Sequence, residues 1–298
     1  MRRVTWAATT FLVLGTLSPQ TAQADSSAGT VTLPAGAAPY SVAVSPDGTR
    51  AYTSNFATNT VSVVRTSTGT VVGDPIAVGA APSAIVVSPD GAHVYTANQQ
   101  DDTVSDITVA TGSVTSITVG DYPNGLAISP DGSRLFVTNW FGASVSVVDT
   151  ATGTESTTFP AVGPWSIAIS PDGSRLYVGN FSSDTVTVLD STDGSVVGAP
   201  IQVGSGPSGL AMSPDGSRLY VMAFNVGDLV TVDTAAASVL GSVSVGAQSY
   251  GVAATPDGSR VYVASFGTDR LLSVSTATDK VTQRVAVGPG PWGLAITP

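Results

Sequence analysis

The sequence predicts an all-β fold, a β-propeller of four-stranded antiparallel blades. The chain holds 32 Gly and 19 Pro with only 11% charged residues, a composition that suits strands and tight turns better than helices. The tripeptide "PDG" recurs every 41 to 43 residues, with its aspartate at positions 47, 90, 131, 172, 215 and 257. A period of this length indicates a propeller or a solenoid. Each period contains four short apolar stretches separated by turn signals, which is typical of a propeller blade.

Residues 1–24 precede the repeats and are predicted to be a signal peptide. Two arginines are followed by the apolar run Val4–Leu17 and by a small-x-small site at Ala22–Ala24, so cleavage is expected before Asp25. An N-terminal membrane anchor is the alternative, and the arginine pair leaves general and twin-arginine export open. We therefore expect a secreted, extracytoplasmic protein, with cell-surface association open. No transmembrane segment is expected after signal removal, because no other apolar run is long enough to cross a bilayer.

One repeat illustrates the elements of the predicted domain, which covers residues 25–298. Four strands, named A to D, are expected at Pro164–Ser170, Arg175–Asn180, Thr185–Asp190 and Ser195–Val203. Apolar residues occupy both faces of "LAI" and "VTVL", as expected for a sheet stacked between two neighbouring sheets. The repeats start near residues 36, 79, 120, 163, 204 and 246, with a partial repeat from 288.

The two ends of the domain carry single strands. Gly29–Gly36 is predicted to be a lone strand D, and Gly290–Pro298 a lone strand A. In a seven-bladed ring these two strands would share the last blade. The sequence thus predicts six complete repeats plus a partial seventh, a propeller of the seven-bladed type, and we expect the chain to be C-terminally incomplete.

Two strands of the repeat carry a family resemblance. "RLYVGN" and "RLFVTN", followed by "TVTVLDSTDG" and "SVSVVDTATG", resemble the YVTN β-propeller repeat family. The resemblance covers the chain from about Val31 to its C-terminus. That family includes secreted and cell-surface proteins, and its wider relatives include lactonase-type propellers and subunits of quinoprotein dehydrogenases. The resemblance therefore implies an architecture more than a function.

Antiparallel connectivity sorts the loops onto two faces. The A–B and C–D turns share one face, here called the turn face, and the B–C and D–A loops share the other. The A–B turns read "SPDG" with little variation, and we interpret their aspartates as turn formers. Calcium needs several converging oxygen ligands, whereas each turn supplies one carboxylate on a separate blade. We expect no metal and no cofactor.

The opposite face, here called the aromatic face, varies from repeat to repeat. Strand A follows a D–A loop, and the first position after the proline of this loop should circle the axis. It holds Tyr40, Ser83, Asn124, Trp165, Ser208, Tyr250 (where Ser249 replaces the proline) and Trp292. The position after strand B holds Phe56, Gln99, Trp140, Phe181, Phe224 and Phe266. We interpret the post-B phenylalanines as fillers between blades. The predicted ligand-binding residues are Tyr40, Asn124, Trp140, Trp165, Tyr250 and Trp292, because a propeller mouth is a common concave site.

Residues that could carry catalysis are few. The chain has no cysteine and a single histidine, His93, which replaces the arginine of the other repeats. No Ser-His-Asp set, histidine-rich metal site or phosphate cradle is present, so no catalytic residue is predicted. Asp106 stands where Val63 and Val147 stand in other repeats. The strand is either exposed or slipped there, or the carboxylate is buried and needs a partner.

The charge of the chain restricts its partners. Without its two leader arginines, the chain has 9 Lys and Arg against 21 Asp and Glu, a formal charge of −12, so no nucleic-acid partner is expected. The main hypothesis is a noncatalytic binding scaffold for a protein, a glycan or a small molecule. The alternative is a lactonase- or lyase-like enzyme with its site in the central channel, and a purely structural surface-layer module is a third.

Overall fold

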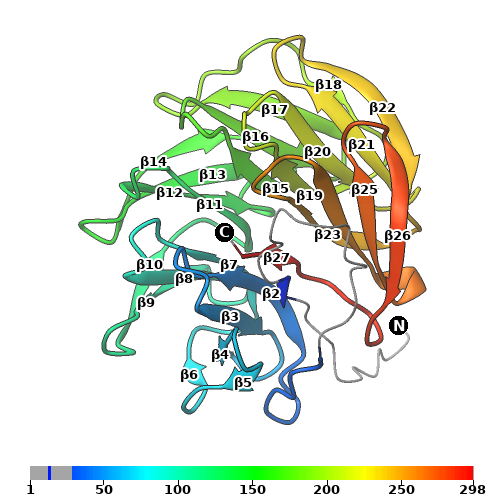
Figure 1. Ribbon diagram of the computed structural model, residues 1–298. Helices are drawn as coiled ribbons and strands as arrows, with labels where there is room; N and C mark the ends of the chain where they lie inside the picture. The colour runs from blue at the N-terminus through cyan, green and yellow to red at the C-terminus, as the bar shows by residue number, and fades with distance from the viewer. Residues whose placement is uncertain (1–12, 15–28, 298) are drawn as a thin grey trace, which may run out of the picture.

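Six antiparallel sheets form a ring in the computed structural model, which describes residues 13–14 and 29–297 (Figure 1). The fold is thus an all-β propeller, as predicted. Apart from the two residues of β1 (Val13–Leu14), the predicted signal peptide and its cleavage site lie outside the described residues. Within the described part, no helix has the length and apolar character needed to cross a membrane.

The first three blades occupy the N-terminal half of the chain. Blade 1 contains β2 (Pro39–Val44), β3 (Arg50–Asn55), β4 (Thr60–Arg65), β5 (Thr70–Val71) and β6 (Ile76–Ala77). Blade 2 contains β7 (Pro82–Val87), β8 (His93–Asn98), β9 (Thr103–Thr108) and β10 (Val114–Thr118). Blade 3 contains β11 (Pro123–Ile128), β12 (Arg134–Asn139), β13 (Ser144–Asp149) and β14 (Thr154–Pro160).

The remaining blades follow in the same order. Blade 4 contains β15 (Pro164–Ile169), β16 (Arg175–Asn180), β17 (Thr185–Asp190) and β18 (Ile201–Gln202). Blade 5 contains β19 (Pro207–Met212), β20 (Arg218–Ala223), β21 (Asp228–Asp233) and β22 (Ser238–Ser244). Blade 6 contains β23 (Ser249–Ala254), β24 (Arg260–Ser265), the 3₁₀ turn η1 (Phe266–Thr268), β25 (Arg270–Ser275) and β26 (Lys280–Ala286), and β27 (Ala295–Ile296) comes last.

The outermost strand is the element that the sequence predicted least well. The expected strand D of blade 4, Ser195–Val203, is reduced to β18 and an isolated bridge between Leu189 and Val196. In blade 1 the corresponding strand is split into β5 and β6. Both interruptions contain a glycine with positive φ, Gly73 at 70° and Gly198 at 74°, followed two residues later by a proline, which cannot donate a ladder hydrogen bond.

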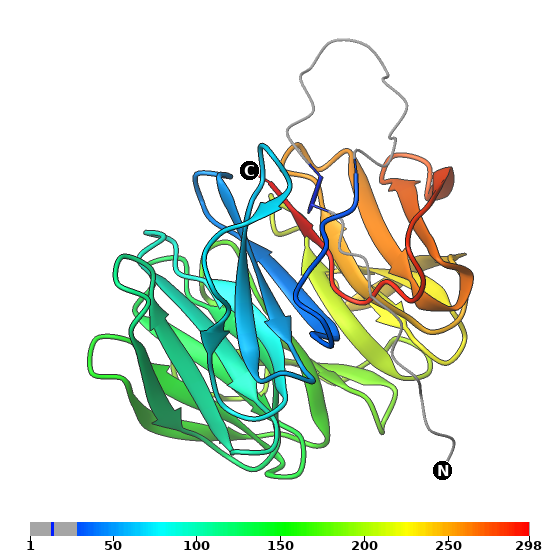
Figure 2. The ribbon, with the colours of Figure 1, turned by 90° about the horizontal axis from the view of Figure 1, so that it is seen from below.

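The ring has seven inner positions although it has six complete blades. The inner strands β2, β7, β11, β15, β19 and β23 each contact the next, and β27 contacts both β23 and β2. Figure 2 shows β27 (red) between blade 6 (orange) and blade 1 (blue). The C-terminal segment thus takes the place of an inner strand at the seventh position, as the predicted lone strand A required. Strand β27 also pairs in parallel with β1.

The predicted lone strand D does not form a strand. Residues 29–36 contain no assigned strand. Val31 and Leu33 nevertheless pack against a cluster of blade 1 that includes Val42 and Val64, and Ala295 of β27 joins the same cluster. The segment therefore lies beside the seventh position without completing a sheet there.

Hydrogen bonds tie the inner strands to one another. The Ser83 hydroxyl donates to the carbonyl of Asn124 at 3.1 Å, and the Ser208 hydroxyl donates to the carbonyl of Ser249 at 3.1 Å. From the second strand of blade 3, the Thr138 hydroxyl donates to the carbonyl of Trp165 in the inner strand of blade 4 at 3.1 Å. Each of these bonds crosses from one blade to the next. The wall of the channel is therefore held by side-chain bonds as well as by apolar packing.

Candidate functional site

The aspartates of the turn face build the turns. The Asp172 carboxylate accepts the Ser170 hydroxyl at 2.5 Å and the Ser174 amide at 3.0 Å. The Ser170 hydroxyl oxygen in turn accepts the Arg175 amide at 2.9 Å, and Gly173 takes a φ of 75°. These bonds, first among them the one from Ser170, lower the pKa of Asp172 to about 2. The prediction that these aspartates are structural is confirmed by this bonding.

Metal ligands do not converge in the described residues. Among these residues no group of three or more His, Cys, Asp or Glu side chains is placed to hold a metal ion.

Aromatic rings form a nearly continuous band on the aromatic face, here called the aromatic girdle. Consecutive ring centroids are 4.0 to 6.3 Å apart. In order around the axis the girdle consists of Phe56, Tyr40, Trp292, Tyr250, Phe224, Phe181, Trp165, Trp140, Phe141 and Tyr122. All three tryptophans beyond residue 24 belong to it. The chain therefore concentrates its largest rings around one opening.

A polar sector interrupts the girdle at blades 2 and 3. The buried Gln99 side chain donates to the Asn124 amide oxygen at 2.5 Å. The Asn124 amide nitrogen then donates to the carbonyl of Trp165 at 2.8 Å. Gln99 also lies beside the Tyr40 hydroxyl and acts on it, so the amide groups of the polar sector reach from Tyr40 to Trp165.

The tyrosines at the mouth stay protonated at neutral pH. Burial raises the pKa of Tyr250 to about 12. Burial also raises the pKa of Tyr40, and the hydrogen bond with Gln99 opposes this shift only in part. Neither phenol can serve as a general base near neutral pH.

Below the girdle the axis of the ring holds a cavity of about 260 Å³. Tyr40, Asn124, Trp165, Tyr250 and Trp292 line it, and deeper residues of the inner strands continue the wall. None of the lining side chains carries a charge; the wall is made of apolar, aromatic, hydroxyl and amide groups together with glycine. The channel can therefore hold a neutral molecule, and the only titratable side chains of its lining are the two protonated phenols of Tyr40 and Tyr250.

The predicted site residues thus lie around one opening. Five of the six line the cavity, and Trp140 contacts Trp165 from outside the lining, at 4.2 Å between ring centroids and 81° between planes. Phe181 and Phe266 fill space between blades, because a Cβ at Gly206 or Gly290 of the next loop would meet their rings at 3.0 and 2.7 Å. This packing agrees with their interpretation as fillers.

Two aromatic residues of this face were not predicted as site residues. Tyr122 packs against Phe141 at 4.8 Å between centroids, and 65% of the surface of Phe141 is exposed. Their positions in adjacent loops on one face were readable from the sequence, since Tyr122 stands in "GDYPNG" and Phe141 follows Trp140. They extend the girdle outward from the mouth.

The interpretation of β9 as exposed or slipped at Asp106 is wrong. The strand keeps its register, with Tyr95 opposite Asp106, and Asp106 is only 9% exposed. Its carboxylate contacts His93 Nδ1 at 2.8 Å. The sequence contained a signal for this pair, because repeat 2 alone replaces both the arginine and the apolar residue at these two positions.

Comparisons with known proteins place the fold. A model of the family "Lactonase, 7-bladed beta-propeller" matches residues 13–159, just under half of the chain. The chain is similar in structure to a hydrazine synthase of Kuenenia stuttgartiensis (25% identity, 89% of this chain and 91% of that chain, TM-score 0.79). No curated protein matches the sequence.

Two lyase structures share the fold at lower identity. The virginiamycin B lyase of Staphylococcus aureus is 15% identical over 87% of this chain and 88% of its own, with a TM-score of 0.73. A streptogramin B lyase is 14% identical over 87% of each chain, with a TM-score of 0.74. The chain is thus a propeller of the lactonase-like type in architecture.

Proposed function

We propose that the chain is an extracytoplasmic, noncatalytic binding propeller of the YVTN-repeat type, secreted or held at the cell surface, whose ligand enters the aromatic mouth. The observation that carries the proposal is the girdle around a cavity without charged side chains. Aromatic rings bind apolar surfaces and the C–H faces of rings, and a few fixed polar groups set orientation. The polar sector at Gln99 and Asn124 supplies such groups.

The chemistry of the mouth favours a neutral ligand with a flat face. A charged group placed there would lose water without gaining a partner of opposite charge. A protein segment, a glycan and a small molecule remain the three ligand classes of the proposal. Neutral sugar rings combine an apolar C–H face with hydroxyls that can bond the amides of the polar sector, so glycans are the first class to test.

The test uses the tryptophans as reporters. Titration of neutral oligosaccharides of glucose, galactose and N-acetylglucosamine should shift the fluorescence of Trp140, Trp165 and Trp292 saturably. Trp165→Ala should weaken binding at least about tenfold, as loss of a buried aromatic contact does. Leu240→Ala is the control, because this exposed side chain lies on the outer strand β22, away from the mouth. Binding that survives Trp165→Ala, or failure of all three sugar classes together with small apolar probes, would contradict the proposal.

An enzyme of the lactonase or lyase type is the second candidate, and the family match over residues 13–159 favours it. Such chemistry needs acids, bases or a metal at the reacting atoms, and the cavity lining offers no carboxylate, histidine, lysine or arginine, only the protonated phenols of Tyr40 and Tyr250. A lactone panel assayed with and without divalent metals distinguishes the candidates. Turnover that disappears on chelation would replace the binding proposal by this one.

A further inference from the structure

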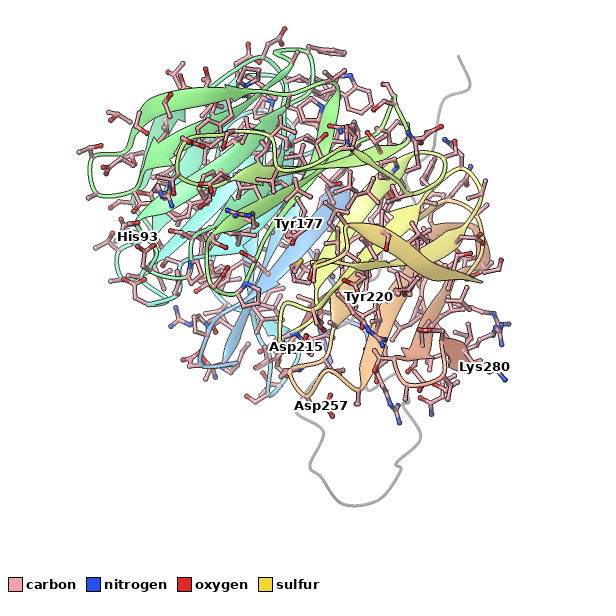
Figure 3. The ribbon with its side chains drawn as sticks, turned by 90° about the horizontal axis from the view of Figure 1, so that it is seen from above. His93, Tyr177, Asp215, Tyr220, Asp257 and Lys280 are labelled. Atoms are coloured by element: carbon pink, nitrogen blue, oxygen red, sulfur yellow. The ribbon has the colours of Figure 1, made fainter. Side chains whose placement is uncertain are left out.

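The turn face carries a second candidate site, at the interface of blades 2 and 3. A pocket of about 240 Å³ lies there, lined by Asp90, His93, Tyr95, Asp131 and Thr150 among others. The interface of blades 5 and 6 has a pocket of about 340 Å³ built from the equivalent residues, Asp215, Arg218, Tyr220, Asp257 and Thr276. Figure 3 shows Asp215, Tyr220 and Asp257 close together, with His93 in a different part of the ring. The two pockets differ mainly in one side chain, arginine in one and histidine in the other.

In two blades the arginine bonds across the interface, whereas Arg175 bonds Asp190 of its own blade at 2.6 Å. Arg218 Nη1 donates to the carbonyl of Thr276 in the next blade at 2.8 Å. Arg134 Nη1 donates in the same way to the carbonyl of Ser191 at 2.5 Å. These blades therefore place a guanidinium group between two turn aspartates and a carbonyl of the neighbouring blade.

Blade 2 lacks this guanidinium group. His93 turns back to its own blade, where Nδ1 contacts Asp106 at 2.8 Å. The carbonyl of Thr150, equivalent to those of Ser191 and Thr276, has no hydrogen-bond donor among the described residues. An acceptor that Arg134 and Arg218 use at two other interfaces is thus left open.

A second departure in blade 2 frees a carboxylate oxygen. In the other five turns a Ser or Thr hydroxyl two residues after the aspartate bonds its Oδ2, as Ser217 does to Asp215 at 2.8 Å. Blade 2 has Ala92 at this place, and Asp90 uses only Oδ1, for Ser88 and the Ala92 amide. Within the described residues, no hydrogen bond reaches Asp90 Oδ2.

The third departure adds charge behind the pocket. Asp106 is 9% exposed, and its Oδ2 has no hydrogen bond among the described residues, since His93 contacts Oδ1. Asp90 and Asp131 line this pocket, and no Lys or Arg side chain does, while Asp106 bonds His93 from outside the lining. The pocket of blades 5 and 6 balances its two turn aspartates with Arg218.

We propose that the pocket between blades 2 and 3 binds a guanidinium group from a ligand, in the place that Arg134 and Arg218 fill at other interfaces. The planar fork of a guanidinium can bond a carboxylate and a carbonyl together. The rings of His93 and Tyr95, nearly parallel at 13° and 6.0 Å apart between centroids, offer a flat wall for it. The site is separate from the aromatic mouth, which lies on the opposite face.

The single histidine of the chain is a direct reporter of this site. L-Argininamide added to the full chain near neutral pH should shift the ring proton resonances of His93 saturably in NMR spectra. L-Citrullinamide, a neutral molecule of the same shape, should not shift them, and L-lysinamide should bind more weakly. Added salt should weaken the argininamide response, because the attraction is electrostatic.

Two variants and one control complete the test. His93→Arg should fill the pocket with the chain's own guanidinium and lower the affinity for argininamide at least about tenfold in calorimetry. Asp106→Val should weaken binding through loss of charge, while Asp215→Asn at the other pocket should leave it unchanged. The proposal is overturned by an absence of saturable shifts, by an equal response to citrullinamide or lysinamide, or by full binding in His93→Arg.

Discussion

Gly293 offers a direct test of whether β27 closes the ring. A Cβ at this position would lie 2.8 Å from Ser41 Cα and 3.0 Å from Val42 N, whereas carbon atoms pack at about 3.5–4.0 Å. Since both neighbours are backbone atoms, Gly293→Ala must push the strand away from blade 1 by roughly 1 Å. The shift would separate Trp292 from Tyr40, whose ring centroid is now 5.1 Å away, and press it against Tyr250 of blade 6, at 4.0 Å.

The expected cost of Gly293→Ala follows from these contacts. Overpacking costs about 1–3 kcal/mol, and each aromatic pair contributes about 0.5–1.5 kcal/mol. We expect a loss of about 2–4 kcal/mol in the free energy of unfolding, because the strand can relax and keep part of the contacts. Thermal unfolding should show Tm lower by roughly 5–10 °C.

The control for this variant is Gly241→Ala in β22. A Cβ at Gly241 would meet no heavy atom within 4 Å, so its Tm should stay within about 2 °C of the parent chain. Equal Tm values for the two variants would refute the reasoning, because the C-terminal segment would then not be packed against Ser41 and Val42 of blade 1.

Three further predictions concern the turn face. The pKa of each turn aspartate is lowered, chiefly by the Ser or Thr hydroxyl two residues before it, to about 2 in Asp131, Asp172 and Asp215. The resulting stabilisation is complete above the unfolded pKa of about 3.9 and is lost as the pH falls through the folded values. The free energy of unfolding measured in urea should therefore fall between about pH 4 and pH 2, and it should fall less in Asp172→Asn. A pH profile of that variant identical to that of the parent chain would contradict the assignment. Ala92→Ser should give Asp90 the hydroxyl partner of the other turns and raise Tm slightly; a lower Tm would show that the turn of blade 2 is built differently. The double variant His93→Arg, Asp106→Val restores the pattern of repeats 1, 3 and 4 and should be at least as stable as the parent chain in thermal unfolding, since an apolar residue often replaces a buried charge without loss; clear destabilisation would mean that the pair is required for folding.

The sequence was sufficient to predict the inner three strands of each blade. Strand Arg175–Asn180 and strand Thr185–Asp190 match the structure residue for residue, because tight turns bound them and both faces are apolar. The fourth strand has one neighbour in its sheet and faces solvent on its outer edge, so its apolar pattern is weak. Short inserts at Gly73 and Gly198 could therefore break it in blades 1 and 4 without disturbing the core.

The candidate sites were predictable in position but not in bonding. Repeat alignment placed Tyr40, Trp165 and Trp292 on one face. The link from Tyr40 through Gln99 to Asn124 joins three different blades, and no spacing rule within one repeat describes it. The same limit applies to blade 2. The open carbonyl of Thr150 is recognised only because the structure shows Arg134 and Arg218 bonding the equivalent carbonyls of their neighbouring blades.

The departures from the repeat are not spread evenly around the ring. The polar sector of the mouth depends on Gln99 of blade 2 and Asn124 of blade 3. The pocket of the turn face lies between the same two blades, where His93 replaces the arginine and Thr150 offers its carbonyl. A propeller blade gains nothing in packing from these changes, since Asp106 introduces a buried charge and Ala92 removes a turn hydrogen bond. Because the costs on the turn face fall where the polar sector also lies, we infer that the sector of blades 2 and 3 supplies polar groups for binding on both faces, while Tyr40, Trp165, Tyr250 and Trp292 of the mouth lie outside these two blades.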